Sequence, residues 1–521
     1  MRSSAEAPSS LERRWFAWPG VALVSTIVIV PVVRLALRVI SSDSLIEVWS
    51  RPGVMSSLIF TVWQTLVSTT LTLVVGLPSA WAFSRHAFPM RRLALAVVTV
   101  PFILPTVVVG AAFLQMLPHG IERGWFAVIV AHVYFNIAVV VRTVAPAWAM
   151  VDPGLDEAAR SLGASRPRAF LTTTLPILRP AIFSAAAIVG FMCFTSYGVV
   201  RMLGGGSATI EVEIYRRAML FGDVSGATVL ALGQLAILAV CLFLWGRHRS
   251  IIADRVRGRS RRSPKAEIVA WLTVVVTVVP LVGLVIASVR NRGRWSLAGW
   301  RVLLGRTEIG GLDVNLASTI TRSLTFAAIA TSIAVPIGLL SVHSSRDRRD
   351  RALLVPMGVS AVAIALGVLV TYDRPPFDFR SSWWLVPLVH AVVALPFVVR
   401  TIGPVRAGIP DDLRRAASTL GAPPTRVWRT IDRPLMTTAI RTAAGLSAAL
   451  SLGEFGATSL MSRRDTDTLP VVVERLLARS GDLARLSGQG AAVVLLGLSV
   501  MVLTLIGRVD DLGTDRLRGR A

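Results

Sequence analysis

Lysine is nearly absent from this 521-residue chain, although arginine is abundant. Lys265 is the only lysine among 55 basic residues. The phosphate-binding loop of nucleotide hydrolases needs a lysine directly after its glycines, whereas Lys265 follows the residues RRSP. We therefore expect no ATP hydrolysis by that device in this chain, so any such activity would come from a partner.

Cysteine and charged residues are scarce as well. Cys193 and Cys241 both lie within long apolar runs, which argues against a disulfide framework and a thiolate metal site. Histidines and carboxylates show no ligand spacing, so we expect neither a metal site nor a catalytic site. Charged residues make up 16% of the chain, hydrophobic residues make up 53%, and the mean hydropathy is +0.64. This composition excludes a soluble globular protein and places the chain in a membrane.

Apolar runs long enough to cross a bilayer recur along the whole chain. We expect an all-α polytopic membrane protein with about twelve transmembrane helices. The first run is too long for a signal peptide and no small-residue cleavage site follows it, so we interpret it as a retained helix. The runs are 17–40, 57–83, 93–117, 125–150, 181–203, 225–246, 266–288, 317–343, 352–372, 383–407, 438–461 and 486–507.

The net charge of +25 could suggest a nucleic-acid partner, but its distribution favours a membrane topology instead. Loops on the side of the N-terminus carry roughly twice as many basic residues as loops on the other side, as cytoplasmic loops do. We therefore expect both termini in the cytoplasm and no nucleic-acid partner. The densest basic cluster, Gly246 to Lys265, is interpreted as a solvated linker, with binding of lipid headgroups as the alternative.

The chain repeats itself at an offset of 258 residues. When residues 131–164 are placed over 389–422 without a gap, 13 of 34 positions are identical, among them His132 with His390 and Gly163 with Gly421. Each half has six expected spans, an even number, so the halves form a parallel repeat about an axis along the membrane normal. We expect a first half at 1–246, a basic cytoplasmic linker at 247–265 and a second half at 266–521.

A polar loop follows the fourth span of each half, at 152–176 and 410–434. In the first copy Asp152 suits a helix N-cap, Pro153 the first turn and Gly163 a left-handed end, which predicts a short helix. A second short helix is expected to end at Pro176. Helices this short are marginal in water, so we expect each to dock either on a partner or on the protein's own cytoplasmic face.

The first loop resembles the EAA signature of permeases in ATP-binding cassette importers, which is written E-A-A, three residues, G, nine residues, I-x-L-P. Matching positions in the first copy are Glu157, Ala158, Ala159, Gly163, Leu175 and Pro176, with Thr173 in place of isoleucine. Matching positions in the second copy are Ala416, Ala417, Gly421, Ile431 and Pro434. Arg415 replaces the glutamate and Arg433 the leucine, so the two loops are expected to couple with unequal strength.

This resemblance implies the fold and the partners. The chain is similar to fused double permeases of the type I importers, in particular those for thiamine and for ferric iron. It implies a bacterial plasma-membrane protein without a cofactor of its own. The implied partners are an ATPase homodimer, which hydrolyses ATP with Mg on the cytoplasmic side, and an extracytoplasmic substrate-binding protein. The implied coupling residues are Glu157, Ala158, Ala159, Gly163, Ala416, Ala417 and Gly421.

Polar residues inside apolar spans are costly and usually face an interior or a wet cavity. They nominate a translocation path through His132, Asn136, Ser196, Tyr197, His390 and Glu454. Glu454 would suit a cationic cargo, with an ion pair to a nearby arginine as the alternative. A histidine in an apolar span is more often a hydrogen-bonded structural group, which is the alternative for His132 and His390.

A secondary transporter of the major facilitator type, driven by an ion gradient, is the alternative function. It would also have twelve spans in two parallel halves. That class carries a Gly and Asp-Arg signature between its second and third spans, where this chain reads RHAFPMRR from Arg85. It also gives no reason for two similar loops. A channel is disfavoured because no selectivity-filter sequence is evident. The cargo is not fixed by the residues.

Overall fold

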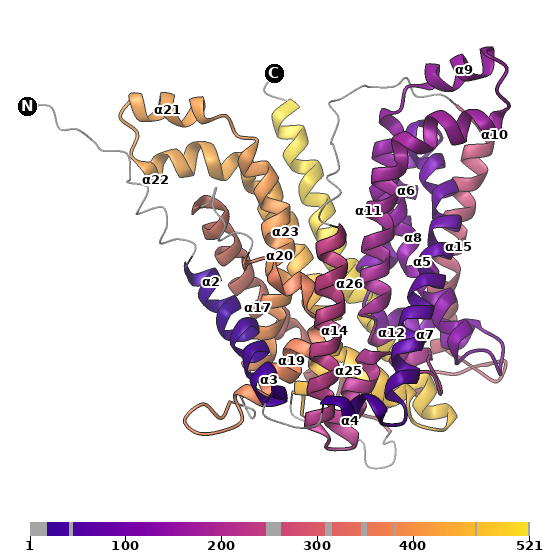
Figure 1. Ribbon diagram of the computed structural model, residues 1–521, viewed down its shortest axis with the longest axis vertical. Helices are drawn as coiled ribbons and strands as arrows, with labels where there is room; N and C mark the ends of the chain where they lie inside the picture. Colours follow the sequence, from indigo (N-terminus) through magenta and orange to yellow (C-terminus); the bar gives the residue numbers. More distant parts are fainter. Residues whose placement is uncertain are drawn as a thin grey trace, which may run out of the picture.

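The computed structural model describes residues 18–40, 45–245, 262–307, 315–344, 352–379, 382–463 and 466–518. The described chain is a tall helical assembly with one antiparallel pair of two-residue strands (Figure 1). Residues 247–261 of the expected linker lie outside the described residues, and the division into halves at that linker stays a prediction.

The helices of the first half alternate long membrane-crossing segments with short ones. They are α2 (Trp18–Val24), η1 (Ser25–Ile29), α3 (Val30–Ile40), α4 (Leu45–Ser50), α5 (Val54–Arg85), α6 (Arg91–Ile103), α7 (Thr106–Met116), α8 (Trp125–Met150), α9 (Pro153–Ser161), α10 (Arg166–Ala169), η2 (Phe170–Thr174), α11 (Leu175–Phe194), α12 (Gly198–Leu203), α13 (Ile210–Tyr215), η3 (Arg216–Leu220) and α14 (Val224–Trp245).

The second half repeats this order and adds the two strands after its first helix. Its elements are α15 (Pro264–Ser288), β1 (Arg290–Asn291), β2 (Arg294–Trp295), α16 (Ala298–Leu303), α17 (Leu316–Ser344), η4 (Val355–Gly358), α19 (Ala361–Thr371), α20 (Leu385–Ala407), α21 (Asp411–Thr419), α22 (Pro424–Val427), η5 (Trp428–Asp432), α23 (Arg433–Gly453), α24 (Gly456–Met461), α25 (Leu469–Leu477) and α26 (Asp482–Arg518).

Among the described residues, ten helices are long and apolar enough to cross a membrane, and the third run of each half accounts for the difference from twelve. In the first half that run is a bent pair, because α6 and α7 meet at 99° where Pro105 cannot continue the α6 helix. In the second half its apolar helix, α19, has only 11 residues.

The fifth run of each half is also broken, which corrects the expected continuous spans at 181–203 and 438–461. Helix α11 ends at Phe194 and α23 ends at Gly453, and the short helices α12 and α24 begin after them at Gly198 and Gly456. A Cβ on Gly198 would lie 2.1 Å from Thr106 Oγ1, so only glycine fits where α12 meets α7. A Cβ on Gly456 would lie 3.1 Å from Val362 Cγ2 on α19, a tight contact but not a prohibitive one, so the repeated glycine lies against the third run of its own half in both copies.

The short helices that follow these breaks are attached to the second span of their own half. The backbone N–H of Ile210, the first residue of α13, donates to Thr61 Oγ1 on α5 at 2.9 Å. The N–H of Leu469, the first residue of α25, donates to Ser323 Oγ on α17 at 2.9 Å. The two halves therefore share this tertiary contact as well as their sequence repeat.

The two halves interlock through their first spans. Helix α15 packs on α5, α6 and α7 of the first half, and α3 packs on α19 of the second half. Two hydrogen bonds fix α15 to the first half, from Tyr134 Oη to the carbonyl of Thr277 and between Ser79 and Thr273. Each half thus supplies an outer helix to the other, and the pair forms one assembly.

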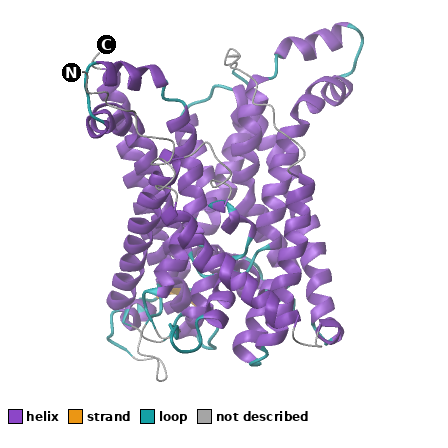
Figure 2. Cartoon of the chain, turned by 60° about the vertical axis from the view of Figure 1, so that its left-hand side comes forward, coloured by secondary structure: helices purple, strands orange, loops and turns teal. Residues whose placement is uncertain are grey.

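The apolar core is shared at one end of the molecule and divided at the other. One cluster joins α7, α12 and α13 to α19, α24 and α25, and thus contains both halves. Two further clusters belong separately to the first half with α15, and to the second half. Figures 1 and 2 show the helices spreading apart towards the end that carries α9, α10, α21 and α22. We name this end the loop end and the opposite one the closed end.

Candidate functional site

A cavity of about 300 Å³ lies between the two halves at the breaks in their helices. Its walls come from the α6–α7 bend, the α11–α12 break, the α23–α24 break and the start of α19, together with α8 and α20. It includes two carboxylates, Glu211 and Glu454, and its lining contains no lysine or arginine. Five of the six nominated path residues line it, namely His132, Asn136, Ser196, Tyr197 and Glu454, and His390 does not.

Both repeated histidines form hydrogen bonds that stabilise the fold. His132 on α8 is buried, its Nε2 lies 2.8 Å from Ser196 Oγ at the α11–α12 break, and its Nδ1 lies 3.4 Å from Ser68 Oγ on α5. His390 on α20 lies 2.8 Å from both Ser451 Oγ and Thr458 Oγ1, on either side of the α23–α24 break. The repeated histidine therefore pins the broken fifth span in each half.

Asn136 lies one helical turn beyond His132 and has spare hydrogen-bonding capacity. Its Nδ2 donates to the carbonyl of His132 at 2.9 Å. Its Oδ1 is buried and has no partner among the described residues. A buried acceptor without a partner is uncommon, and this one belongs to a residue that lines the cavity.

The closed end of the cavity is sealed by contacts between the halves. The rings of Tyr197 and Phe455 lie 5.2 Å apart between centroids, and Ser459 Oγ donates to Tyr197 Oη at 3.0 Å. Further towards that end, Arg201 on α12 forms an ion pair with Glu474 on α25 at 2.9 Å.

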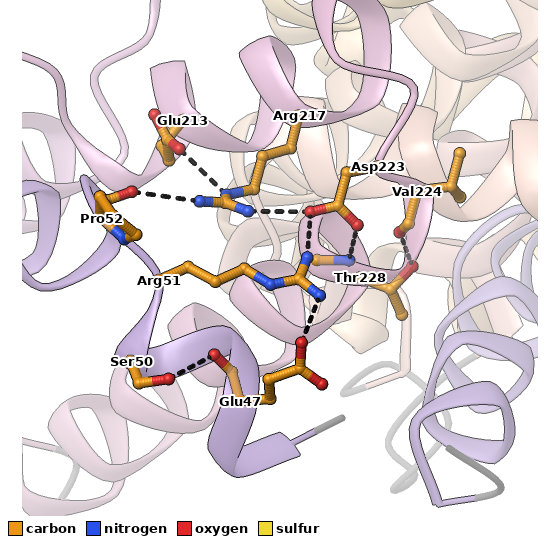
Figure 3. A network of polar contacts seen from close by, with 10 residues as sticks. Glu47, Ser50, Arg51, Pro52, Glu213, Arg217, Asp223, Val224 and Thr228 are labelled. Carbon is orange, nitrogen blue, oxygen red and sulfur yellow. Dashed lines mark hydrogen bonds and ion pairs between the residues drawn. The ribbon is translucent and has the colours of Figure 1, made fainter. Parts of the chain in front are cut away.

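A polar network braces the closed end of the first half (Figure 3). Arg217, after α13, lies 3.0 Å from Glu213 and 2.8 Å from Asp223, and Arg51 also contacts Asp223 at 2.8 Å. Glu47 on α4 completes the network at 3.3 Å from Arg51. The network therefore ties the α4–α5 turn to the hairpin between α13 and α14.

Asp223 is the centre of this network. Burial alone would raise the pKa of the Asp223 carboxyl, but three groups outweigh it and lower that pKa below its usual value. They are the backbone N–H of Gly226, which donates to Asp223 Oδ1 at 2.8 Å, and the guanidinium groups of Arg217 and Arg51. Asp223 is thus held as a carboxylate at neutral pH.

The first polar loop forms the expected short helix. Asp152 Oδ1 accepts the N–H of Gly154 at 2.9 Å, Pro153 is the first helical residue, and Gly163 has φ +87° after α9. The N–H of Ala164 donates to the carbonyl of Ala159 at 3.1 Å, which closes a Schellman end. The second short helix differs from expectation: it does not end at Pro176, because η2 carries it directly into α11.

The second loop has the same helical end. Gly421 has φ +77°, and the N–H of Ala422 donates to the carbonyl of Ala417 at 3.0 Å. The sequence AA, two residues, LGA therefore encodes one local structure in both copies. A Cβ on Gly163 or Gly421 would meet no atom within 4 Å, so each glycine is required by backbone angle and not by crowding.

Sequence reasoning missed the leucine that precedes each of these glycines. Leu162 is 90% exposed and Leu420 is 88% exposed, the largest values among the large hydrophobic side chains described. Both occupy the same place in the repeat and project from the loop end, beyond α9 and α21. Their recurrence directly before a helix-ending glycine was the available signal.

The two loops differ in how they are held. Arg414 on α21 contacts Asp411 at 2.7 Å and the buried Asp432 at 2.8 Å, and it thereby fixes α21 to η5. The first copy has Asp156 and Thr174 at the positions of Arg414 and Asp432. Arg415 and Glu157, the residues of opposite charge at the signature's first position, are both exposed.

Comparisons with known proteins show which proteins this chain resembles. Residues 72–258 match the model of the binding-protein-dependent transport system inner membrane component. The thiamine transport system permease protein of Brucella abortus (strain 2308) is 26% identical over 505 residues, which cover 88% of this chain and 87% of that protein. Over 88% of its length the chain therefore resembles a permease of a binding-protein-dependent ATP-binding cassette importer. The ten long apolar helices among the described residues agree with a multi-pass membrane protein.

Two further relatives bear on the layout of this permease. The thiamine transport system permease protein of Escherichia coli (strain K12) is 23% identical over 512 residues, which cover 90% of this chain and 91% of that protein. The probable sulfate transport system permease protein of Chlorokybus atmophyticus is 29% identical over 268 residues, which cover 47% of this permease and 91% of that protein. That relative is therefore about half as long as this chain, as expected for a fused double permease.

Proposed function

We propose that this permease forms the translocation path of a thiamine importer driven by a separate ATPase. The observation that carries the proposal is the pair of loops at the loop end, which share one helical end and expose a leucine each. Surfaces of this kind suit docking, because a large apolar side chain in water gains about 1.5–3 kcal/mol when a partner buries it. A major-facilitator transporter is not favoured by the family match.

In this proposal the loop end faces the cytoplasm, both termini lie there, and an ATPase homodimer receives the two loops. The ATPase binds and hydrolyses ATP with Mg. The force passes through Glu157, Ala158, Ala159, Gly163, Ala416, Ala417 and Gly421, and through the exposed leucines. The brace at Arg414 and the charge reversal at Arg415 make the second coupling unequal to the first. A substrate-binding protein docks at the closed end, on the outer side of the membrane.

The division of the apolar core at the loop end indicates the conformation in which the transport cycle starts. With separate cores at the loop end and a shared core at the closed end, the described arrangement corresponds to a path closed towards the outside. ATP closes the ATPase dimer and draws the two loops together. The helices that follow the loops then separate Tyr197 from Phe455 and open the path to the substrate-binding protein. Hydrolysis reverses the movement.

Thiamine is the preferred cargo for two reasons. Two relatives that extend over most of this chain, from Brucella abortus and Escherichia coli, are named as thiamine permeases. The central cavity also contains carboxylates and no basic side chain, which suits a cationic solute. Ferric iron is the second candidate, because the sequence also resembles the ferric-iron permeases.

Reconstitution tests this function directly. The permease is placed in liposomes with the proposed ATPase and substrate-binding protein, and uptake of labelled thiamine is measured with and without ATP. We expect accumulation only when all three proteins and ATP are present. Accumulation by the permease alone in response to an ion gradient would overturn the proposal.

Docking through the loops is tested by co-purification of the ATPase with matched variants of the permease. Gly163→Val together with Gly421→Val should abolish ATPase binding, because valine is strained at a positive φ and the loop ends would unwind. Gly283→Val is the control, since Gly283 on α15 has no atom near its Cβ position and no positive φ. Equal ATPase recovery with the double variant and the control would contradict docking through these loops.

A further inference from the structure

We propose that the central cavity holds a cation-binding subsite built from Glu454 and Glu211, one carboxylate from each half. The inference rests on the proposed function and deepens it, because it names the groups that recognise the cargo. The ligand class is an organic cation, of which the thiazolium ring of thiamine is an example. Glu211 was not among the residues nominated from the sequence.

The cavity is negatively charged in a strongly basic protein. The chain has a net charge of +25, yet its central cavity is lined by two carboxylates and by neither lysine nor arginine. Within the described part of the chain, Glu454 and Glu211 form no ion pair with an arginine, which removes the structural alternative considered for Glu454. A carboxylate at membrane depth without a counter-ion is costly, so it is retained where it has a function.

Glu211 has an unused hydrogen-bonding position. Its side chain is fully covered, its Oε1 accepts Nε2 of Gln234 at 2.6 Å, and its Oε2 has no partner in hydrogen-bonding geometry among the described residues. Ser360 is a neighbouring residue whose Oγ accepts the N–H of Ala363, while its hydroxyl hydrogen remains available to Glu211. Asn136 Oδ1 is a second buried cavity acceptor without a partner. The cavity groups without a partner are therefore acceptors, which suit the exocyclic amine of thiamine, while its thiazolium ring, which has no N–H, is attracted by the carboxylate charge alone.

Glu454 is the more accessible carboxylate. It lies at the α23–α24 break, lines the cavity and is only partly buried. Its Oε1 accepts the N–H of Ala457 at 3.0 Å, which holds the side chain in place. Glu211 lines the same cavity, so a negative charge on either carboxylate adds to the potential inside it. We assign direct contact with the cation to Glu454 and the supporting charge to Glu211.

The remaining lining suits a flat cation. Phe102, Phe135 and Tyr197 line the cavity, and aromatic faces attract cations. The volume of about 300 Å³ falls at the lower end of the range for small-molecule sites. The cavity can therefore hold one small organic solute with both its charge and its ring contacted.

The subsite is not a by-product of the repeat. The position equivalent to Glu454 in the first half is Ser196, which bonds to His132 instead. The position equivalent to Glu211 in the second half is Pro470, because Ile210 and Leu469 begin α13 and α25 and make the same contact. Each half therefore contributes its carboxylate from a position where the other half has none. Glu454 and Glu211 therefore form one pair that does not follow the repeat symmetry of the two halves.

Direct binding to the purified full-length permease in lipid nanodiscs tests the inference without the ATPase. The probes are labelled thiamine, with 3-methylthiazolium as a cationic competitor and neutral 4-methylthiazole as its uncharged match. We expect the cation to compete and the neutral ring not to compete. Glu454→Gln should weaken thiamine binding at least about tenfold and Glu211→Gln about threefold, since each removes a charge from a low-dielectric cavity. Glu122→Gln, on an outer loop, should leave binding unchanged.

Two substitutions of Glu454 distinguish a loss of cation recognition from a loss of folding. Glu454→Gln keeps the acceptor for the N–H of Ala457, so α24 should be preserved, and Glu454→Asp keeps the charge and should retain cation selectivity. Unchanged thiamine binding in both glutamine variants would overturn the inference, and so would a wild-type permease that binds neither cation up to about 10 mM.

Failure of the subsite and failure of the proposed function give different results. ATP-driven uptake of thiamine with the same KM in wild type and in both glutamine variants overturns the subsite and leaves the importer intact. Cation binding that depends on Glu454, together with no ATP-driven thiamine uptake, supports the subsite and overturns thiamine as the cargo.

Discussion

Tyr197 and Phe455 stand 258 positions apart, at equivalent places in the repeat, and their rings meet at the centre of the molecule with centroids 5.2 Å apart. Each residue lies in the break of the fifth span of its half, directly before the short helix that follows. The contact is therefore made by the two elements that directly continue from the polar loops through α11 and α23. A movement of the loops would reach this contact without passing through any other span.

A disulfide cross-link tests this contact as the gate. In a chain whose native Cys193 and Cys241 are replaced by serine, the pair Tyr197→Cys and Phe455→Cys should cross-link readily without nucleotide. Cross-linking should fall at least about fivefold when the ATPase is trapped with ATP and vanadate, because the gate opens towards the outside. Electrophoresis under non-reducing conditions measures the yield.

The control pair for the gate is Ser79→Cys with Thr273→Cys, which joins α15 to α5 within one side of the assembly. Its yield should not respond to nucleotide. A nucleotide response of equal size in both pairs, or in neither, would contradict the assignment of the gate to Tyr197 and Phe455.

The exposed leucines should dominate docking of the ATPase. Leu162→Glu and Leu420→Glu replace an apolar contact with a charge that must lose its water, so each should reduce ATPase affinity by more than about tenfold. Leu304→Glu, at a leucine that is 64% exposed away from the loops, should have no effect. Surface plasmon resonance with the purified ATPase gives the affinities. Loss of affinity in Leu304→Glu alone would move the docking surface elsewhere.

Much of the fold follows from the sequence because its signals are local. Hydropathy located the apolar runs to within a few residues for helices such as α8, and Asp152, Pro153 and Gly163 encode the start and end of α9 by capping and backbone angle. The cue for Leu162 was also local but went unused. Such features need no knowledge of the rest of the chain.

The breaks and the cavity could not be read in the same way because they depend on contacts between distant segments. Gly198 ends a span because α12 must approach Thr106 closely, and nothing near Gly198 encodes that neighbour. Glu211 belongs to a polar segment that looked external by hydropathy, and it reaches the cavity only because α13 is anchored by Thr61. Thr106 and Thr61, the residues that determine the roles of Gly198 and Glu211, each lie more than 90 positions away from them in the sequence.

The repeated histidine should contribute to stability more than to transport selectivity. His390→Ala leaves two buried hydroxyl groups, on Ser451 and Thr458, without their imidazole partner, and we expect the loss of about 2 kcal/mol of unfolding free energy. His119→Ala is the control because its side chain is fully exposed. Thermal unfolding in detergent measures both. A variant as stable as wild type, with altered cargo selectivity, would make His390 a path residue instead.

The network around Asp223 predicts how stability depends on pH. Because the pKa of Asp223 is lowered in the folded protein from an ordinary value of 3.8, its stabilising contribution is complete above that value and is lost as the pH falls through the lower, folded pKa. Asp223→Asn should therefore be less stable than wild type at pH 7, with the difference shrinking below about pH 4. Melting temperatures measured across this range give the difference. A difference that grew on acidification would reverse the sign and refute the assignment.

The distance between the two loops tests most directly whether they transmit motion from an ATPase. Thr172 and Thr430 are exposed, occupy equivalent positions beside the loops and can carry spin labels in a chain without native cysteines. Electron–electron resonance in the complete complex should show the two labels approaching each other when ATP binds and separating after hydrolysis. A distance that is the same with and without ATP, in a complex that imports thiamine, would contradict the account.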